Sequence, residues 1–125
     1  MSPARLVLAV VVAGIVGTIA NSVVVAALTP NAFLTLATSP GCNAVAIAVA
    51  VLLPVIYAAL SGLPAAVLAL AATTVVPSIL AKLVFGIDAP WLFVLGVNAV
   101  YAVAAWAVWL AMAQTGGSRP AHAAR

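Results

Sequence analysis

The chain has 125 residues, of which 68% are hydrophobic and 4% are charged, and its formal net charge is +3. A soluble domain has roughly 25% charged residues, so this composition excludes a water-soluble fold, and so much apolar side chain also excludes a disordered chain. Three of the four basic residues lie close to the chain ends. This distribution suits a lipid bilayer and excludes a nucleic-acid partner, so we expect an all-α membrane protein.

The first predicted transmembrane helix covers residues 5–28. A basic residue, Arg5, followed by an apolar run is also the pattern of a signal peptide. The apolar run nevertheless continues from Val23 to Leu28, which gives a length sufficient to cross the membrane. We therefore interpret the segment as an uncleaved membrane span.

Small residues recur every fourth position in this first span, at Ala9, Ala13 and Gly17, and Asn21 continues the series. Residues four apart share one face of a helix. Small residues let the backbones of two membrane helices approach closely. We expect this face to pack against another helix, with the Asn21 amide forming a hydrogen bond across the interface.

The second predicted helix covers residues 43–60 and the third covers residues 64–85, with a tight turn at 61–64 between them. Each contains an internal proline, Pro54 or Pro77, which removes a backbone donor and clashes with the carbonyl four residues earlier. We predict a helix kink at both prolines. Hydroxyls that can donate to the carbonyls near Pro77 belong to Thr73, Thr74 and Ser78. A static kink that shapes the bundle is favoured over a hinge or an ion-coordinating kink.

The fourth predicted helix covers residues 91–113, after a short loop at 86–90. Trp91 marks one membrane interface, while Trp106 and Trp109 approach the other. Trp91 and Trp109 are 18 residues apart, which is about 27 Å along a helix, close to the ~30 Å hydrocarbon core. Residues 114–125 are predicted to form a flexible tail. Residues 29–42 form the one substantial loop, which either lies in the interface or extends a neighbouring helix.

The basic residues predict the orientation of the bundle. Arg5 precedes the first span, and Arg119 and Arg125 follow the fourth. Positive charge near short loops stays in the cytoplasm, and four spans return the chain to its starting side. We expect both termini to be cytoplasmic, with the loops at 29–42 and 86–90 outside. The alanine- and valine-rich composition and short loops are typical of a bacterial inner membrane protein.

With this orientation, the polar residues of the spans gather in the outer half of the membrane. From the helical rise, Lys82 lies ~6 Å and Asn98 ~10 Å below the outer surface. Polar residues within a membrane usually face the bundle interior or a cavity. We predict an outward-facing polar pocket lined by Asn21, Ser78, Lys82 and Asn98, with Tyr101 one turn below Asn98.

The same residues also have a structural interpretation, which is the alternative to a pocket. A lysine near a helix end can extend its ammonium group to the interface. Asp88 lies in the adjacent loop, six residues after Lys82, and we predict an ion pair between them. On this interpretation Asn21 and Asn98 form a hydrogen bond with each other and fix the register of two helices.

The sequence contains no catalytic motif, and its single cysteine, Cys42, has no partner for an internal disulfide. No pattern predicts a metal site or a cofactor, and we expect a protein that is not an enzyme. The favoured function is an accessory or structural subunit that packs on itself, as a homo-oligomer, or on a larger membrane complex. The alternatives are an oligomeric small-solute transporter or channel component, or a lipid-binding protein, each using the pocket around Lys82.

Overall fold

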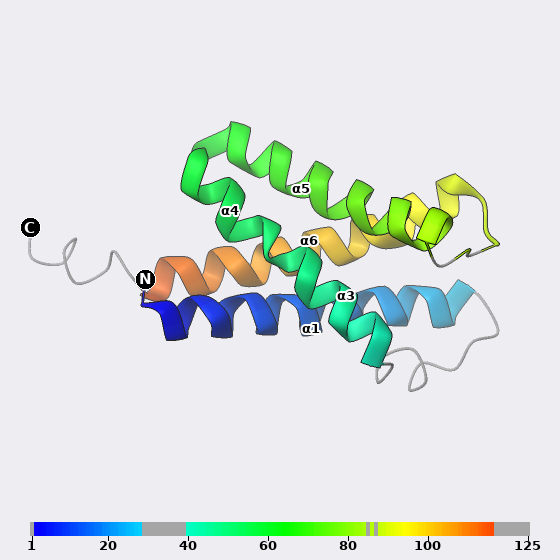
Figure 1. Ribbon diagram of the computed structural model, residues 1–125, viewed down its shortest axis with the longest axis horizontal. Helices are drawn as coiled ribbons and strands as arrows, with labels where there is room; N and C mark the ends of the chain where they lie inside the picture. Colours follow the sequence, from blue (N-terminus) through cyan, green and yellow to red (C-terminus); the bar gives the residue numbers. More distant parts are fainter. Residues whose placement is uncertain (1, 29–39, 85, 87, 117–125) are drawn as a thin grey trace, which may run out of the picture.

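The computed structural model describes residues 2–28, 40–84, 86 and 88–116. Helices account for 92% of the described residues, and none of these residues lies in a β-strand. The elements in chain order are α1 (Pro3–Leu28), α3 (Pro40–Ala50), α4 (Leu52–Ala59), α5 (Gly62–Ile79), the π-helix η1 (Leu80–Val84) and α6 (Trp91–Gly116). Figure 1 shows these elements arranged as an elongated helical bundle.

Four segments of the described chain are long and apolar enough to cross a membrane, which confirms the predicted fold class. They are Pro3–Leu28, Pro40–Ala59, Gly62–Val84 and Trp91–Ala113. The protein is therefore a multi-pass integral membrane protein built from a four-helix bundle.

The ends of the described helices differ from the approximate predicted spans by up to three residues. The second span begins at Pro40 rather than at residue 43, so the last three residues of the predicted loop extend α3. α6 continues to Gly116, so it includes the first three residues of the segment predicted as a tail. The remainder of the predicted loop, residues 29–39, and of the tail, residues 117–125, lies outside the described residues.

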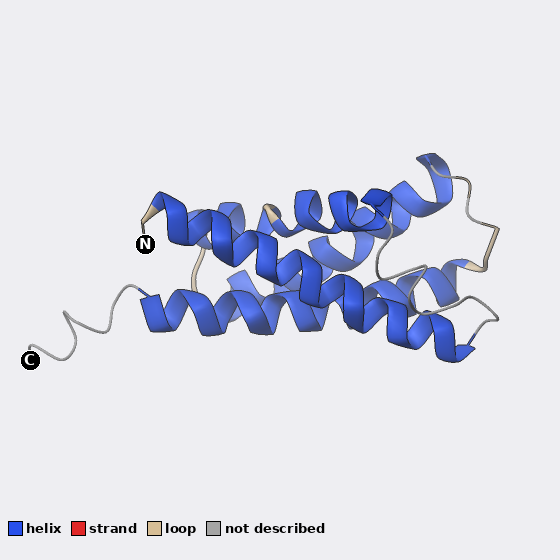
Figure 2. Ribbon diagram, turned by 90° about the horizontal axis from the view of Figure 1, so that it is seen from below, coloured by secondary structure: helices blue, strands red, loops and turns tan. Residues whose placement is uncertain are grey.

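α1 and α6 run side by side in opposite directions and form the most extensive helix contact of the bundle (Figures 1 and 2). In Figure 1 α3 lies obliquely across α1, and α5 packs on α6. The start of α1 and the end of α6 share one end of the bundle, where Nη2 of Arg5 donates to the Met112 carbonyl at 3.2 Å. The start of α6 and η1 lie at the opposite end.

Small residues fill much of the interior, and large apolar side chains face outward. Leu63, Leu83 and Leu92 are 76%, 72% and 84% exposed. Lipid tails are as apolar as these leucines, so their exposure carries no penalty in a membrane, whereas small interior residues allow close packing. The fully buried alanines are Ala9, Ala13, Ala50, Ala65, Ala69 and Ala105.

Two glycines of α1 set how closely its neighbours approach. A Cβ at Gly17 would lie 2.5 Å from Cδ2 of Tyr101 in α6, and a Cβ at Gly14 would lie 2.8 Å from Cα of Ile47 in α3. Any side chain at either position would force a neighbour to move. The predicted small-residue face thus lies inside the bundle, with these members buried: Ala9, Ala13 and Gly17.

Helical geometry changes beside Pro54. α3 ends at Ala50 and α4 begins at Leu52, so the α-helical pattern is interrupted just before the proline. Pro54 has no N–H to donate to the Ala50 carbonyl. The following bond, from the Val55 amide to the Val51 carbonyl, is long at 3.4 Å.

Geometry changes beside Pro77 as well, because α5 becomes the π-helix η1 three residues later. π-helical turns are rare and usually mark a local departure from regular helix bonding. Three hydroxyls near Pro77 donate to carbonyls four residues earlier, with distances of 2.6 to 2.7 Å: Thr73 to Ala69, Thr74 to Leu70, and Ser78 to Thr74. None of these bonds reaches the Thr73 carbonyl, which is the one that Pro77 leaves without its helical donor.

Candidate functional site

Hydrogen bonds between polar side chains join α1, α6 and α5. Nδ2 of Asn21 in α1 donates to the Val97 carbonyl in α6 at 2.8 Å and, with a longer contact of 3.5 Å, to Oδ1 of Asn98. Nδ2 of Asn98 donates to Oγ of Ser78 in α5 at 3.0 Å. The Ser78 hydroxyl donates to the Thr74 carbonyl. We call Asn21, Asn98 and Ser78 together the amide–hydroxyl chain.

Helix geometry explains why these residues meet. Ser78 follows Pro77 on the face of α5 turned toward α6 and is completely buried. Asn98 lies between Ser78 and Asn21, and both asparagines are half-buried. An unpaired polar group in hydrocarbon is costly, whereas each of these side chains directs a donor to a protein acceptor. The amide–hydroxyl chain carries no charge, so it can connect three helices inside a membrane.

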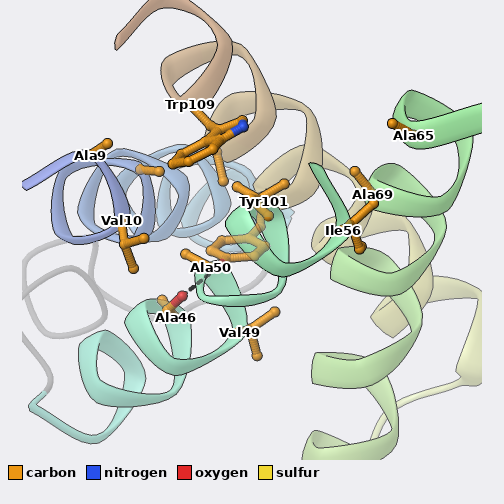
Figure 3. Packing of buried hydrophobic residues seen from close by; sticks show 13 residues of the cluster. Ala9, Val10, Ala46, Val49, Ala50, Ile56, Ala65, Ala69, Tyr101 and Trp109 are labelled. Atoms are coloured by element: carbon orange, nitrogen blue, oxygen red, sulfur yellow. Dashed lines mark hydrogen bonds between the residues drawn. The ribbon is translucent and has the colours of Figure 1, made fainter. Parts of the chain in front are cut away.

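Tyr101, which was predicted to lie one turn below Asn98, belongs to a different contact. Its hydroxyl donates to the Ala46 carbonyl in α3 (Figure 3). Its ring lies against Gly17. Tyr101 is three residues after Asn98, which places it about 60° around α6 from Asn98. The structure therefore separates Tyr101 from the amide–hydroxyl chain and uses it to hold α3.

Lys82 also lies apart from the amide–hydroxyl chain. Its Nζ donates to the Ala89 carbonyl and lies 5.7 Å from the centre of the Trp91 ring. The predicted ion pair with Asp88 is not formed among the described residues, and the Asp88 side chain is exposed. The Ala89 carbonyl and the Trp91 ring, rather than the Asp88 carboxylate, contact the Lys82 ammonium group. The Lys82 side chain thus connects η1 to the start of α6 and to Ala89, which precedes it.

An open apolar depression of about 440 Å³ lies between α1 and α6. It contains no polar side chain and none of the residues predicted for the polar pocket. Such a surface can accommodate a lipid tail or an apolar side chain, but it offers no group that would bind a polar solute. The residues that line it are Ala20, Ala99, Val100, Val103 and Ala104.

Aromatic residues connect α4 and α6 away from the amide–hydroxyl chain. Nε1 of Trp106 donates to the Tyr57 hydroxyl at 2.8 Å, and the rings of Tyr57 and Trp109 are 6.5 Å apart. Trp109 is buried within the apolar cluster of Figure 3 instead of facing lipid. The sequence interpretation of Trp106 and Trp109 as interface residues did not anticipate these interior contacts.

Sequence reasoning missed some of the partners that complete these contacts. The acceptors at Val97, Ala46 and Ala89 are backbone carbonyls. Every residue has such a carbonyl, so a residue pattern does not predict which one accepts a hydrogen bond. Tyr57 was missed although a tyrosine in a membrane span is itself a signal, because its hydroxyl needs a partner there. Among the described residues, no group of three or more His, Cys, Asp or Glu side chains is placed to hold a metal ion.

Comparison of the chain with protein-family models, with curated proteins and with solved structures found no match.

Proposed function

We propose that this protein is a non-catalytic accessory or structural subunit that packs on copies of itself or on a larger membrane complex. The amide–hydroxyl chain is the observation that carries the proposal. Its side chains donate to one another and to backbone carbonyls, so they hold α1, α5 and α6 together. A pathway for a polar solute would instead require polar groups that face a cavity.

The position of Lys82 also favours a structural function over a transporter or channel component. Transport of an anion past Lys82 would require its ammonium group to face a solute pathway. That group is directed to the Ala89 carbonyl and the Trp91 ring at the end of the bundle. No hydrogen bond among the described residues connects it to the amide–hydroxyl chain.

The exposed face of α5 is the surface that we propose for packing on a neighbouring membrane helix. In the most apolar stretch of the span Gly62–Val84, 22% of residues are buried, the same share as in Pro40–Ala59 and less than the 39% in Pro3–Leu28. Val67 and Val75 are among the large apolar residues that α5 leaves exposed. A helix with so little of its surface covered within the bundle leaves apolar surface that a partner can cover.

Photo-crosslinking in native membranes tests this proposal. A photoreactive amino acid at Val67 or Val75 is expected to give adducts of discrete mass, either with a second copy or with one other membrane protein. Val7 is the matched control, because it is an exposed valine on α1. We expect a lower protein yield there. Adducts with lipid alone at all three positions, or equal protein yields from both helices, would contradict the proposal.

We also propose that the protein resides in a bacterial inner membrane with both chain ends in the cytoplasm. Arg5, Arg119 and Arg125 favour this orientation. The common end shared by the start of α1 and the end of α6 is consistent with both termini on one side. A green fluorescent protein fused after Arg125 should fluoresce, and a periplasmic phosphatase fused there should be inactive. An active phosphatase would overturn the orientation.

A further inference from the structure

Among the described residues, no acidic side chain neutralises the positive charge of Lys82. Asp88 provides the only acidic side chain in the sequence, and in the described structure it forms no salt bridge with Lys82. An ammonium group has three N–H donors. The contacts shown for Lys82 are one carbonyl and the face of one ring, from Ala89 and Trp91. The site therefore attracts an anion from outside the protein.

The surroundings of Lys82 indicate where that anion comes from. Lys82 lies in η1, which ends at Val84, just before the chain reverses at Gly86 with a φ of +66°. Its neighbour Leu83 and the second residue of α6, Leu92, are both highly exposed. Apolar side chains that face lipid tails thus flank an ammonium group at the level where the chain leaves the membrane.

We propose that Lys82 and Trp91 bind the phosphate of a phospholipid whose acyl chains lie along Leu83 and Leu92. The phosphate oxygens accept hydrogen bonds from the ammonium group, and the half-exposed Trp91 ring packs at headgroup depth. Because the positive charge is unpaired, the site favours an anionic phospholipid over a zwitterionic one. This binding site is separate from the amide–hydroxyl chain and extends beyond the structural function proposed above.

Native mass spectrometry of the detergent-purified protein, titrated with phosphatidylglycerol, tests the site. The Lys82→Gln variant is expected to bind this lipid about five-fold more weakly than the wild type, the factor typical of one lysine near an anionic surface. Lys82→Arg is the matched control and should retain the lipid, because it retains the charge. Equal affinity of the wild type and Lys82→Gln would overturn the proposal.

Two further measurements keep the site testable if Lys82→Gln does not fold. Asp88→Asn leaves Lys82 in place and removes the only acidic side chain, so the affinity for phosphatidylglycerol should rise. A fall would contradict the proposal. Inorganic phosphate without lipid should not raise the melting temperature of the wild type, because it brings no acyl chains. If it stabilises the protein as much as phosphatidylglycerol does, the assignment to a lipid is wrong.

Discussion

The bundle combines two uninterrupted helices with two interrupted ones. α1 and α6 each run for 26 residues without a break. The span of α3 and α4 and the span of α5 and η1 depart from α-helical geometry near their internal prolines, Pro54 and Pro77. The uninterrupted pair is joined by close approach at Gly17 and by the amide of Asn21. The interrupted helices pack on α1 and α6, which we call the central pair. Small residues thus allow close helix contact in this bundle, whereas prolines change the direction of the helices that surround the central pair.

The largest expected effect comes from closing the space at Gly17. Gly17→Leu would drive a side chain into the Tyr101 ring, since even a Cβ would lie 2.5 Å from it. Overpacking of this kind costs about 1–3 kcal/mol. Unfolding in mixed detergent micelles measures the loss of stability.

Gly96→Leu is the matched control for this substitution. Beyond the backbone of its own helix and its chain neighbours, a Cβ at Gly96 would meet no described atom within 4 Å, so the new side chain extends into open space. We expect little change in the free energy of unfolding. If the Gly17 and Gly96 variants lose similar stability, close packing of α1 on α6 is not what holds the central pair together.

An intermediate effect is expected where the central pair meets the interrupted α5. Asn98→Leu keeps the approximate volume of the side chain but removes its bonds to Ser78 and Asn21. Hydrogen bonds between membrane helices contribute about 0.6 kcal/mol on average, so the loss should be about 1 kcal/mol. A double-mutant cycle with Ser78→Ala should give a positive coupling energy in the same unfolding assay. Strictly additive effects would show that the two side chains do not interact.

A smaller effect is expected for Tyr101→Phe, which removes the hydroxyl that binds the Ala46 carbonyl in α3. The phenylalanine ring still fills the space against Gly17, and the helix supplies its own donor to that carbonyl. The free energy of unfolding should fall by about 0.6 kcal/mol. A loss as large as that for Gly17→Leu would mean that the hydroxyl, rather than the packing of the ring, positions α3.

Much of the fold follows from hydropathy and from the residues that end helices. The first span ends at Leu28 and the fourth begins at Trp91 as predicted, because polar residues and prolines interrupt the apolar runs there. The meeting of Asn21, Asn98 and Ser78 agrees with their similar predicted depth. The depth of a residue in the membrane follows from its position along a helix and the rise per residue, so it can be calculated from the sequence.

The position of Lys82 was not predictable in the same way. Lys82 lies in η1, and a residue pattern does not predict where an α-helix changes to a π-helix. Its acceptor, the Ala89 carbonyl, is a backbone atom in a turn. The expected ion pair with Asp88 rested on spacing alone, which does not fix the direction of either side chain.

Alkylation of a cysteine at position 78 tests most directly whether the amide–hydroxyl chain is closed to solute. A Cys42→Ala background removes the native cysteine, which is exposed. Ser78→Cys and, as a positive control, Asp88→Cys are then treated with a charged maleimide in open membranes, where the reagent reaches both faces. Because Ser78 is completely buried and Asp88 is exposed, we predict labelling at 88 and none at 78. Comparable labelling at both positions would reveal a water-filled pocket and contradict the structural account.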